Sequence, residues 1–265
     1  MNLRFFLSSV LLTGLSSVAL AQQDVQFTQY YHNTIGFNPG VAGSNDAICL
    51  NIGNRSQWVG FDNAPTTQNI NADIPLSILH GGLLVNIVND QIGFFQDISA
   101  AIGYAYQLDL GPGTLGLGLS VDFRNKNVKT AQWIYPDGTA GSNDPTILRP
   151  NTSAMTPELN FGAYYTTDLF YAGLSTSRML QSEANFGGTA RYKSKLHYYL
   201  TGGYHLPLPD YQLVLTPSVL IKSDLNSNLA VDLNVNALFQ DKLYGGLGYR
   251  NQDALSLMAG YQILP

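Results

Sequence analysis

Cysteine, charge and basic residues are all scarce in this chain. A single cysteine, Cys49, among 265 residues excludes an internal disulfide and favours a small buried side chain for this thiol. Charged residues make up 12% of the sequence, against roughly a quarter in soluble proteins, so the protein has little conventional wet surface. The 13 Lys and Arg do not outnumber the 18 Asp and Glu, which argues against nucleic acid as a partner.

The first residues have the pattern of an export signal. Arg4 supplies the positive start, residues 5–18 the apolar core and Ala19–Ala21 the small cleavage site. Residues 1–21 are therefore predicted to be a signal peptide, and the mature chain to begin near Gln22. A lipoprotein would carry a cysteine directly after the cleavage point, and Cys49 lies too far downstream. Beyond the signal no run of about 18 apolar residues occurs, so a membrane-spanning helix is not expected.

Apolar and polar residues alternate with a period of two in many segments. Leu117, Leu119 and Val121, for example, are interleaved with Gly118 and Ser120. Only a strand places successive side chains on opposite faces, so one face of each segment is apolar and needs an apolar neighbour. This pattern predicts strands at about 46–57, 67–76, 81–89, 96–108, 114–126, 158–166, 169–177, 197–206, 211–223, 228–239, 242–250 and 254–263.

Short and long connections alternate between these segments. Tight links such as residues 110–113 are interleaved with long loops such as 126–157 and 178–196. This asymmetry is typical of outer-membrane barrels, which have short periplasmic turns and long external loops. We therefore predict an all-β fold over residues 46–265, a single antiparallel transmembrane outer-membrane barrel with both termini in the periplasm. Twelve strands fit, a hairpin near Asp137 would give fourteen, and a soluble β-sandwich is the competing fold.

Small residues crowd the predicted inner faces of the strands. Gly116, Gly118, Gly162 and Gly173 are among them, and such side chains do not fill a lumen by themselves. Either water occupies this space, as in a pore, or residues 22–45 fold inward. The N-terminal segment 22–45 is thus expected to be a lumen plug or a periplasmic arm.

Candidate chemistry is sparse. The run Gly111–Gly116 resembles a dinucleotide-binding loop but leads into a strand, which favours a plain turn. The four histidines have no metal-ligand spacing, and nothing selects a nucleophile among Ser120, Ser175 and Ser218. Asp122 and Arg124 share one face of a strand and are expected to pair inside the barrel. We therefore predict no enzymatic activity, no metal and no cofactor.

Aromatic residues give the candidate binding sites. Trp58 and Phe61 fall in a predicted external loop, where they could form a binding hot spot for a partner. In the alternative interpretation, Trp58 ends the first strand as a membrane-interface anchor and Phe61 packs on a neighbouring loop. A second candidate in a longer loop comprises Trp133, Ile134 and Tyr135. Six further aromatics at strand ends would form membrane-interface girdles: Tyr104, Tyr106, Tyr199, Phe239, Tyr249 and Tyr261.

The segment after the signal carries a more specific pattern. Residues 23–30 read QDVQFTQY, followed by NPGVAGS at 38–44, NRSQWVGF at 54–61 and PTTQ at 65–68. In this order they resemble the PorP/SprF family of type IX secretion membrane proteins from Bacteroidetes. The family commonly has Ala and Tyr where this chain has Gly40 and Val41. The shared motif residues are Asn38, Pro39, Gly43, Arg55 and Gln57.

The resemblance implies a non-enzymatic outer-membrane barrel of a Gram-negative, Bacteroidetes-like cell. Such barrels help particular exported proteins, including gliding adhesins with their own C-terminal domain, to reach or stay on the cell surface. The expected partners are that C-terminal domain, other type IX secretion components, periplasmic peptidoglycan-linked proteins and outer-membrane lipid. A passive porin or solute channel is the alternative function.

Overall fold

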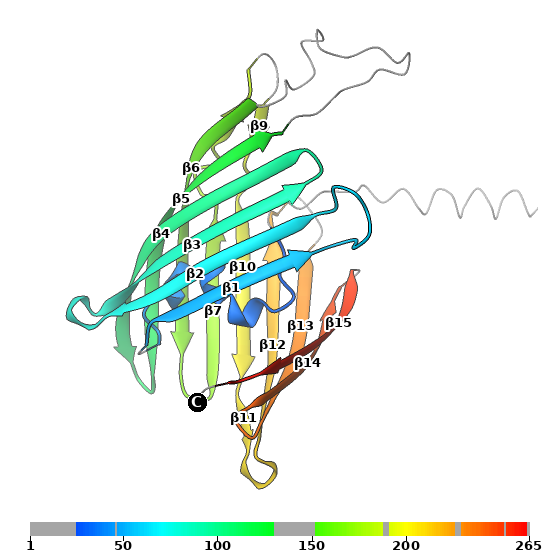
Figure 1. Cartoon of the computed structure of the whole chain (residues 1–265). Helices are drawn as coiled ribbons and strands as arrows, with labels where there is room; N and C mark the ends of the chain where they lie inside the picture. The colour runs from blue at the N-terminus through cyan, green and yellow to red at the C-terminus, as the bar shows by residue number, and fades with distance from the viewer. Residues whose placement is uncertain are drawn as a thin grey trace, which may run out of the picture.

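The chain is almost entirely β-structure in a computed structural model, which describes residues 25–45, 47–129, 152–187, 191–225, 229–251 and 253–263 (Figure 1). Twelve strands of these parts form one hydrogen-bonded series. They are β1 (Cys49–Ser56), β2 (Thr66–Leu76), β3 (Gly81–Ile92), β4 (Phe95–Leu110), β5 (Gly113–Val128), β6 (Thr152–Thr166), β7 (Phe170–Ser177), β10 (His197–Tyr204), β12 (Leu213–Ser223), β13 (Ala230–Phe239), β14 (Leu243–Arg250) and β15 (Ala254–Tyr261).

Each strand of the series pairs antiparallel with the next. The result is a meander that curves round a central space, hereafter the lumen (Figure 1). The all-β antiparallel fold and the twelve predicted strands are confirmed. Among the described residues, β1 and β15 are the ends of the series and are not paired with one another, so the cylinder has a seam between them.

The two faces of the sheet differ in polarity as the alternation predicts. Large apolar side chains such as Leu119, Leu233 and Leu247 are exposed on the convex face. The inward-facing positions of the same strands carry buried polar residues such as Ser120 and Asn234. An exposed apolar face of this extent is what a lipid-covered barrel presents. No helix in the described parts of the chain has the length and apolar character needed to cross a membrane.

Three sequence expectations about individual positions are wrong. Cys49 is exposed and not buried, because β1 is an edge strand with a neighbour on one side only. Tyr199 is buried on the inner face and does not join an outer girdle. The strand expected at 158–166 begins earlier, at Thr152, and pairs with β5 along its whole length despite Pro157.

The connections, as far as the structure describes them, contain three short strands beyond the predicted twelve. Within the loop after β7, β8 (Glu183–Asn185) pairs with β9 (Arg191–Lys193) in a small separate sheet. At the opposite end, β11 (Leu206–Leu208) extends the β12 edge. The predicted turn at Gly111 is confirmed: its φ of 62° is one that glycine adopts easily, and β5 starts two residues later.

The first described residues lie inside the curved sheet. Residues 25–45, here called the inner segment, contain three short 3₁₀-helices: η1 (Tyr30–His32), η2 (Thr34–Gly36) and η3 (Pro39–Val41). Figure 1 shows them in blue within the lumen. The segment packs most extensively through η3, against β4, β5 and β6.

Candidate functional site

Glycines on the inner face of the sheet make room for the inner segment. A Cβ added to Gly118 would lie 2.3 Å from the carbonyl carbon of Pro39, and one added to Gly116 would lie 2.0 Å from the carbonyl oxygen of Gly40. Both distances are shorter than real Cβ contacts, so only glycine lets the two backbones approach this closely. The small residues that the sequence placed inside the barrel are therefore a bed for residues 38–43.

Asn38 anchors the inner segment at its centre. The residue is fully buried, and its Nδ2 donates a 3.1 Å hydrogen bond to the carbonyl oxygen of Ala163 in β6. Its Oδ1 accepts a 2.9 Å bond from the backbone N–H of Gly40, so the side chain caps η3, whose first residue is Pro39. One side chain thus shapes the bend and fixes it to the barrel wall.

Gly43 makes a second backbone contact at the end of the segment. Its φ of 77° is strained for other residues, and an added Cβ would collide with the backbone of Gly81 and Gly82. The N–H of Gly43 donates a 2.6 Å bond to Oδ1 of Asp73 in β2. Gln107 of β4 adds a 2.6 Å bond from Nε2 to the carbonyl oxygen of Ala42. The motif residues Asn38, Pro39 and Gly43 therefore all contribute to the contact between the inner segment and the barrel wall.

Aromatic residues hold the opposite end of the segment. The Tyr30 hydroxyl donates a 2.9 Å bond to Ser218 Oγ of β12, and burial raises the pKa of this phenol. The Phe37 ring stacks on Tyr199 of β10 with a centroid separation of 5.5 Å. His32 lies 4.1 Å from the Tyr31 ring, and burial lowers the pKa of its imidazole.

Two cavities lie on either side of the inner segment. The first, of about 110 Å³, is lined by Phe27 and by residues such as Asp97 and Arg124, near the strand ends that carry the longer loops. The second, of about 540 Å³, is lined by residues such as Thr166 and Tyr244, near the short turns. Ile35 lines both. The inner segment therefore separates the lumen into a loop-side and a turn-side compartment.

Ion pairs line the loop-side part of the lumen. The predicted pair forms, with Arg124 Nε 2.8 Å from Asp122 Oδ2. Arg124 also reaches Asp97 at 3.5 Å, and Lys126 contacts the same carboxylate. These groups are largely shielded from solvent, so the pairs fix the wall of the lumen more firmly than surface pairs would. A second set on the far wall joins Asp232 to Lys222 and Arg250.

The other two motif residues lie away from Asn38. Arg55 is on the inward-facing side of β1, where it interacts electrostatically with Asp90 of β3 and with Asp253 beyond the end of β14. Gln57 follows β1, and its backbone N–H donates a 3.0 Å bond to the carbonyl oxygen of Pro65. The structure thus divides the five motif residues among the inner segment, the end of β1 and the start of the β1–β2 loop.

The predicted aromatic pair is exposed in that loop. Trp58 is 68% exposed and Phe61 is 76% exposed, so Phe61 does not pack on a neighbouring loop as the alternative interpretation held. The Gly93 N–H bonds to the carbonyl oxygen of Asn63, which ties this loop to the β3–β4 turn, where Phe94 is also exposed. The second predicted cluster, Trp133, Ile134 and Tyr135, lies outside the described residues.

The candidate nucleophiles of the sequence make structural contacts in the described part of the chain. No group of three or more His, Cys, Asp or Glu residues there is arranged to hold a metal ion. The three serines considered as nucleophiles have structural contacts: Ser175 donates to the Phe37 carbonyl oxygen, Ser218 accepts from Tyr30, and Ser120 accepts from Asn160. Apart from the small size of the inner residues, nothing in the sequence indicated the close backbone contacts under residues 38–43.

A sheet with an apolar outer face, a polar lumen and an N-terminal segment held inside it defines a membrane-barrel class of protein. The model of the family described as type IX secretion system membrane protein PorP/SprF matches residues 19–264. The match covers nearly the whole chain, and the protein belongs to this family. It is therefore a membrane component of the type IX secretion system. No curated protein matches the chain.

Proposed function

We propose that this protein is a non-enzymatic outer-membrane barrel that holds the C-terminal domain of a secreted surface adhesin during or after type IX export. The observation that carries the proposal is the inner segment. Residues 25–45 occupy the lumen and are fixed to the wall by hydrogen bonds from Asn38, Gln107 and Tyr30. A barrel filled in this way is suited to a scaffold more than to steady passage of solutes.

In the proposed arrangement residues 1–21 are a signal peptide, residues 22–45 are a lumen plug and residues 46–265 are the barrel. The start of β1 and the end of β15 lie at the end with the short turns, which we assign to the periplasm. Val25 and Gln26, the first described residues, line the loop-side cavity instead. The periplasmic turns then contact other type IX secretion components, including peptidoglycan-linked proteins. The long loops face outward, where a secreted partner is met.

The exposed apolar side chains of the β1–β2 loop support a docking surface at the external end. Trp58, Val59 and Phe61 are all mostly exposed, and Phe94 of the neighbouring turn is partly exposed. Interface hot spots are enriched in aromatic residues that become fully desolvated on binding. We assign partner contact to Trp58 and Phe61 and, on sequence grounds, to Trp133, Ile134 and Tyr135.

Purification from the native membrane tests this function. The wild-type barrel should carry a co-purifying secreted protein, and the double variant Trp58→Ala, Phe61→Ala should lose most of it. The matched control is Ile78→Ala, because Ile78 is an even more exposed apolar residue at the opposite end, in η4 (Ser77–Leu79). A barrel that always purifies alone, or equal loss in the Ile78→Ala control, would contradict the proposal.

The rival function as a porin is tested by conductance in planar bilayers. With the inner segment in place we expect small, rare current steps. Steady ohmic conductance of the wild-type protein would favour the channel.

A further inference from the structure

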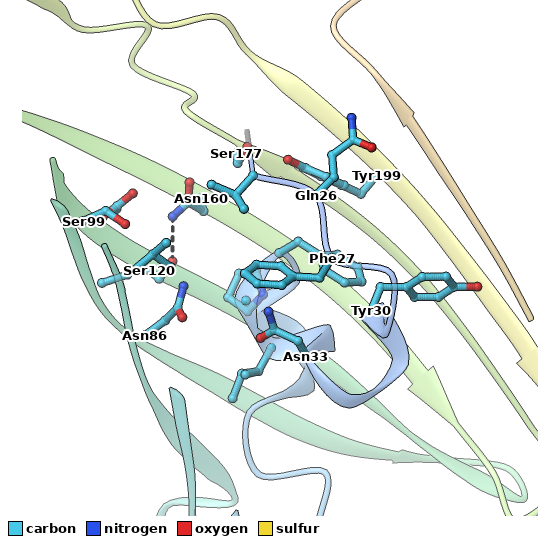
Figure 2. A pocket seen from close by; sticks show the side chains of 18 of the residues that line it. Gln26, Phe27, Tyr30, Asn33, Asn86, Ser99, Ser120, Asn160, Ser177 and Tyr199 are labelled. Atoms are coloured by element: carbon cyan, nitrogen blue, oxygen red, sulfur yellow. Dashed lines mark hydrogen bonds between the residues drawn. The ribbon is translucent and has the colours of Figure 1, made fainter. Parts of the chain in front are cut away.

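The loop-side cavity has room for a side chain and is smaller than a typical ligand pocket. Its volume of about 110 Å³ is several times the roughly 10–15 Å³ that one water molecule needs and lies below the about 300–1,000 Å³ of pockets that bind small organic ligands. Figure 2 shows the ring of Phe27 on one side of this cavity and Asn86, Ser99 and Ser120 on the other. The cavity is therefore flanked by an aromatic ring of the inner segment and by a polar wall.

The register of three strands creates a hollow in the polar wall. Asn86 of β3 is directly opposite Ala101 of β4, which in turn is directly opposite Asp122 of β5. All three side chains line the cavity. Because neighbouring strands are about 4.8 Å apart, the small Ala101 leaves a depression with an amide on one side and a carboxylate on the other.

Both flanking groups present an oxygen that has no hydrogen-bond partner. Asn86 Oδ1 and Asp122 Oδ1 are buried and unpartnered, and Asp122 as a whole is 5% exposed. The other carboxylate oxygen of Asp122 already accepts from Arg124. Higher on the same wall, Asp97 Oδ1 is also buried without a partner. The buried unpartnered atoms of the residues that line this cavity are thus all acceptors, and a group that only donates would satisfy them.

The charge and shape of the lining narrow the choice of donor. Three carboxylates line the cavity, those of Asp90, Asp97 and Asp122, against the two basic side chains of Arg124 and Lys222, while Lys126 contacts Asp97 from outside the lining. A guanidinium group is planar, carries five donors and no acceptor, and stacks on aromatic rings. A guanidinium can therefore donate hydrogen bonds to the acceptors of the wall and stack on the ring of Phe27 at the same time, whereas an ammonium group has no flat face for stacking.

We propose that this cavity receives an arginine side chain of the secreted partner, its guanidinium stacked on Phe27 and hydrogen-bonded to Asn86 and Asp122. The inference rests on the proposed function for the identity of the partner, and on the cavity alone for the chemistry. Residues near the loop ends of the strands, Asp90 and Asp97 among them, form the upper part of the lining, so the side chain enters from the loop side. The inner segment thereby becomes one wall of the binding site.

The purified full-length barrel in detergent is titrated with argininamide and with citrullinamide, its uncharged isostere, by calorimetry. We expect saturable binding of argininamide and about tenfold weaker binding, or none, of citrullinamide. Ala101→Leu, which fills the hollow, should weaken argininamide binding by about tenfold or more. The matched control is Ala100→Leu on the exposed, convex side of the same strand, which should bind like the wild type.

Equal binding of the two amides, unchanged binding in Ala101→Leu, or no saturable binding because water alone fills the cavity would each overturn the assignment. Co-purification separates this inference from the proposed function. If the partner still co-purifies undiminished with Ala101→Leu, the arginine site is wrong and the scaffold function stands. If no partner accompanies even the wild type, the scaffold function fails, and the titration still decides the chemistry of the cavity.

Discussion

Asn38 and Ala163 are 125 residues apart in the sequence and joined by one hydrogen bond in the lumen, from the Asn38 side-chain amide to the Ala163 carbonyl oxygen. Asn38→Ala removes this bond and the cap on η3, and it leaves a buried carbonyl without its donor. We expect the free energy of unfolding of the inner segment to fall by about 1–3 kcal/mol. Limited proteolysis between residues 25 and 45 in detergent should become correspondingly faster. Asn38→Asp keeps an acceptor for Gly40 but turns a buried carboxylate oxygen toward the Ala163 carbonyl oxygen, so it should be cut at least as fast as Asn38→Ala. Equal proteolysis rates in wild type and Asn38→Ala would contradict the anchoring role.

Because glycines of the barrel wall contact the backbone of residues 38–43, we expect one methyl group added at such a glycine to displace the inner segment. In Gly118→Ala the new Cβ would overlap the backbone of Pro39, and backbone is less able to yield than a flexible side chain. We expect the variant to show steady current in planar bilayers where the wild type is nearly closed. Gly245→Ala is the matched control, since a Cβ at Gly245 has no atom within 4 Å. Current that rises equally in both variants would mean that the contact with Pro39 does not close the lumen.

We expect low pH to lower the stability of the folded inner segment, because His32 becomes protonated. Burial lowers the pKa of this imidazole, so the folded state favours the neutral ring and the unfolded state binds the proton more readily. The unfolded form therefore gains protons first as the pH falls, and stability decreases from about pH 6.5 downward, until the folded pKa is also passed. The rings nearest to His32 are those of Tyr31 and Tyr244.

The test of this pH effect compares proteolysis of the inner segment at pH 7.5 and pH 5. The wild type should be cut faster at pH 5, and His32→Gln should lose most of that difference. An unchanged pH dependence in His32→Gln would assign the effect to other groups, such as Asp73.

The strands were predictable from sequence because their chemistry is local, whereas the site was not. An alternation of period two appears in the sequence whatever the neighbouring strand is, and a tight turn such as Gly111–Pro112 shows where one strand ends. Short strands without this alternation, such as β8 and β11, left no comparable signal. The contact between Gly118 and Pro39 depends on a segment about 80 residues away in the sequence, and the hollow at Ala101 depends on the register of three strands. Small inner residues indicated that something fills the lumen, but not which backbone atoms touch.

The seam between β1 and β15 leads to a last prediction. In lipid, every backbone N–H and C=O group must be hydrogen-bonded within protein, and Leu255 and Leu257 at the β15 edge are each 84% exposed. The two edges run antiparallel, because the series contains an even number of alternating strands. Arg55 beside one edge already interacts electrostatically with Arg250 and Asp253 beside the other. We therefore expect β1 and β15 to pair directly in the membrane.

Cys49 is exposed at the start of β1 and provides a natural probe for this closure. Gly260, near the end of β15, lies at the same end of the seam because the strands are antiparallel. In Gly260→Cys, mild oxidation in outer membranes should form a disulfide with Cys49, visible as a shift on a non-reducing gel that reductant reverses. Gly245→Cys, on the neighbouring strand β14, serves as the control and should not cross-link, since its position faces outward. Failure of Gly260→Cys to cross-link, with both thiols reactive toward a small maleimide, would mean that another strand occupies the seam.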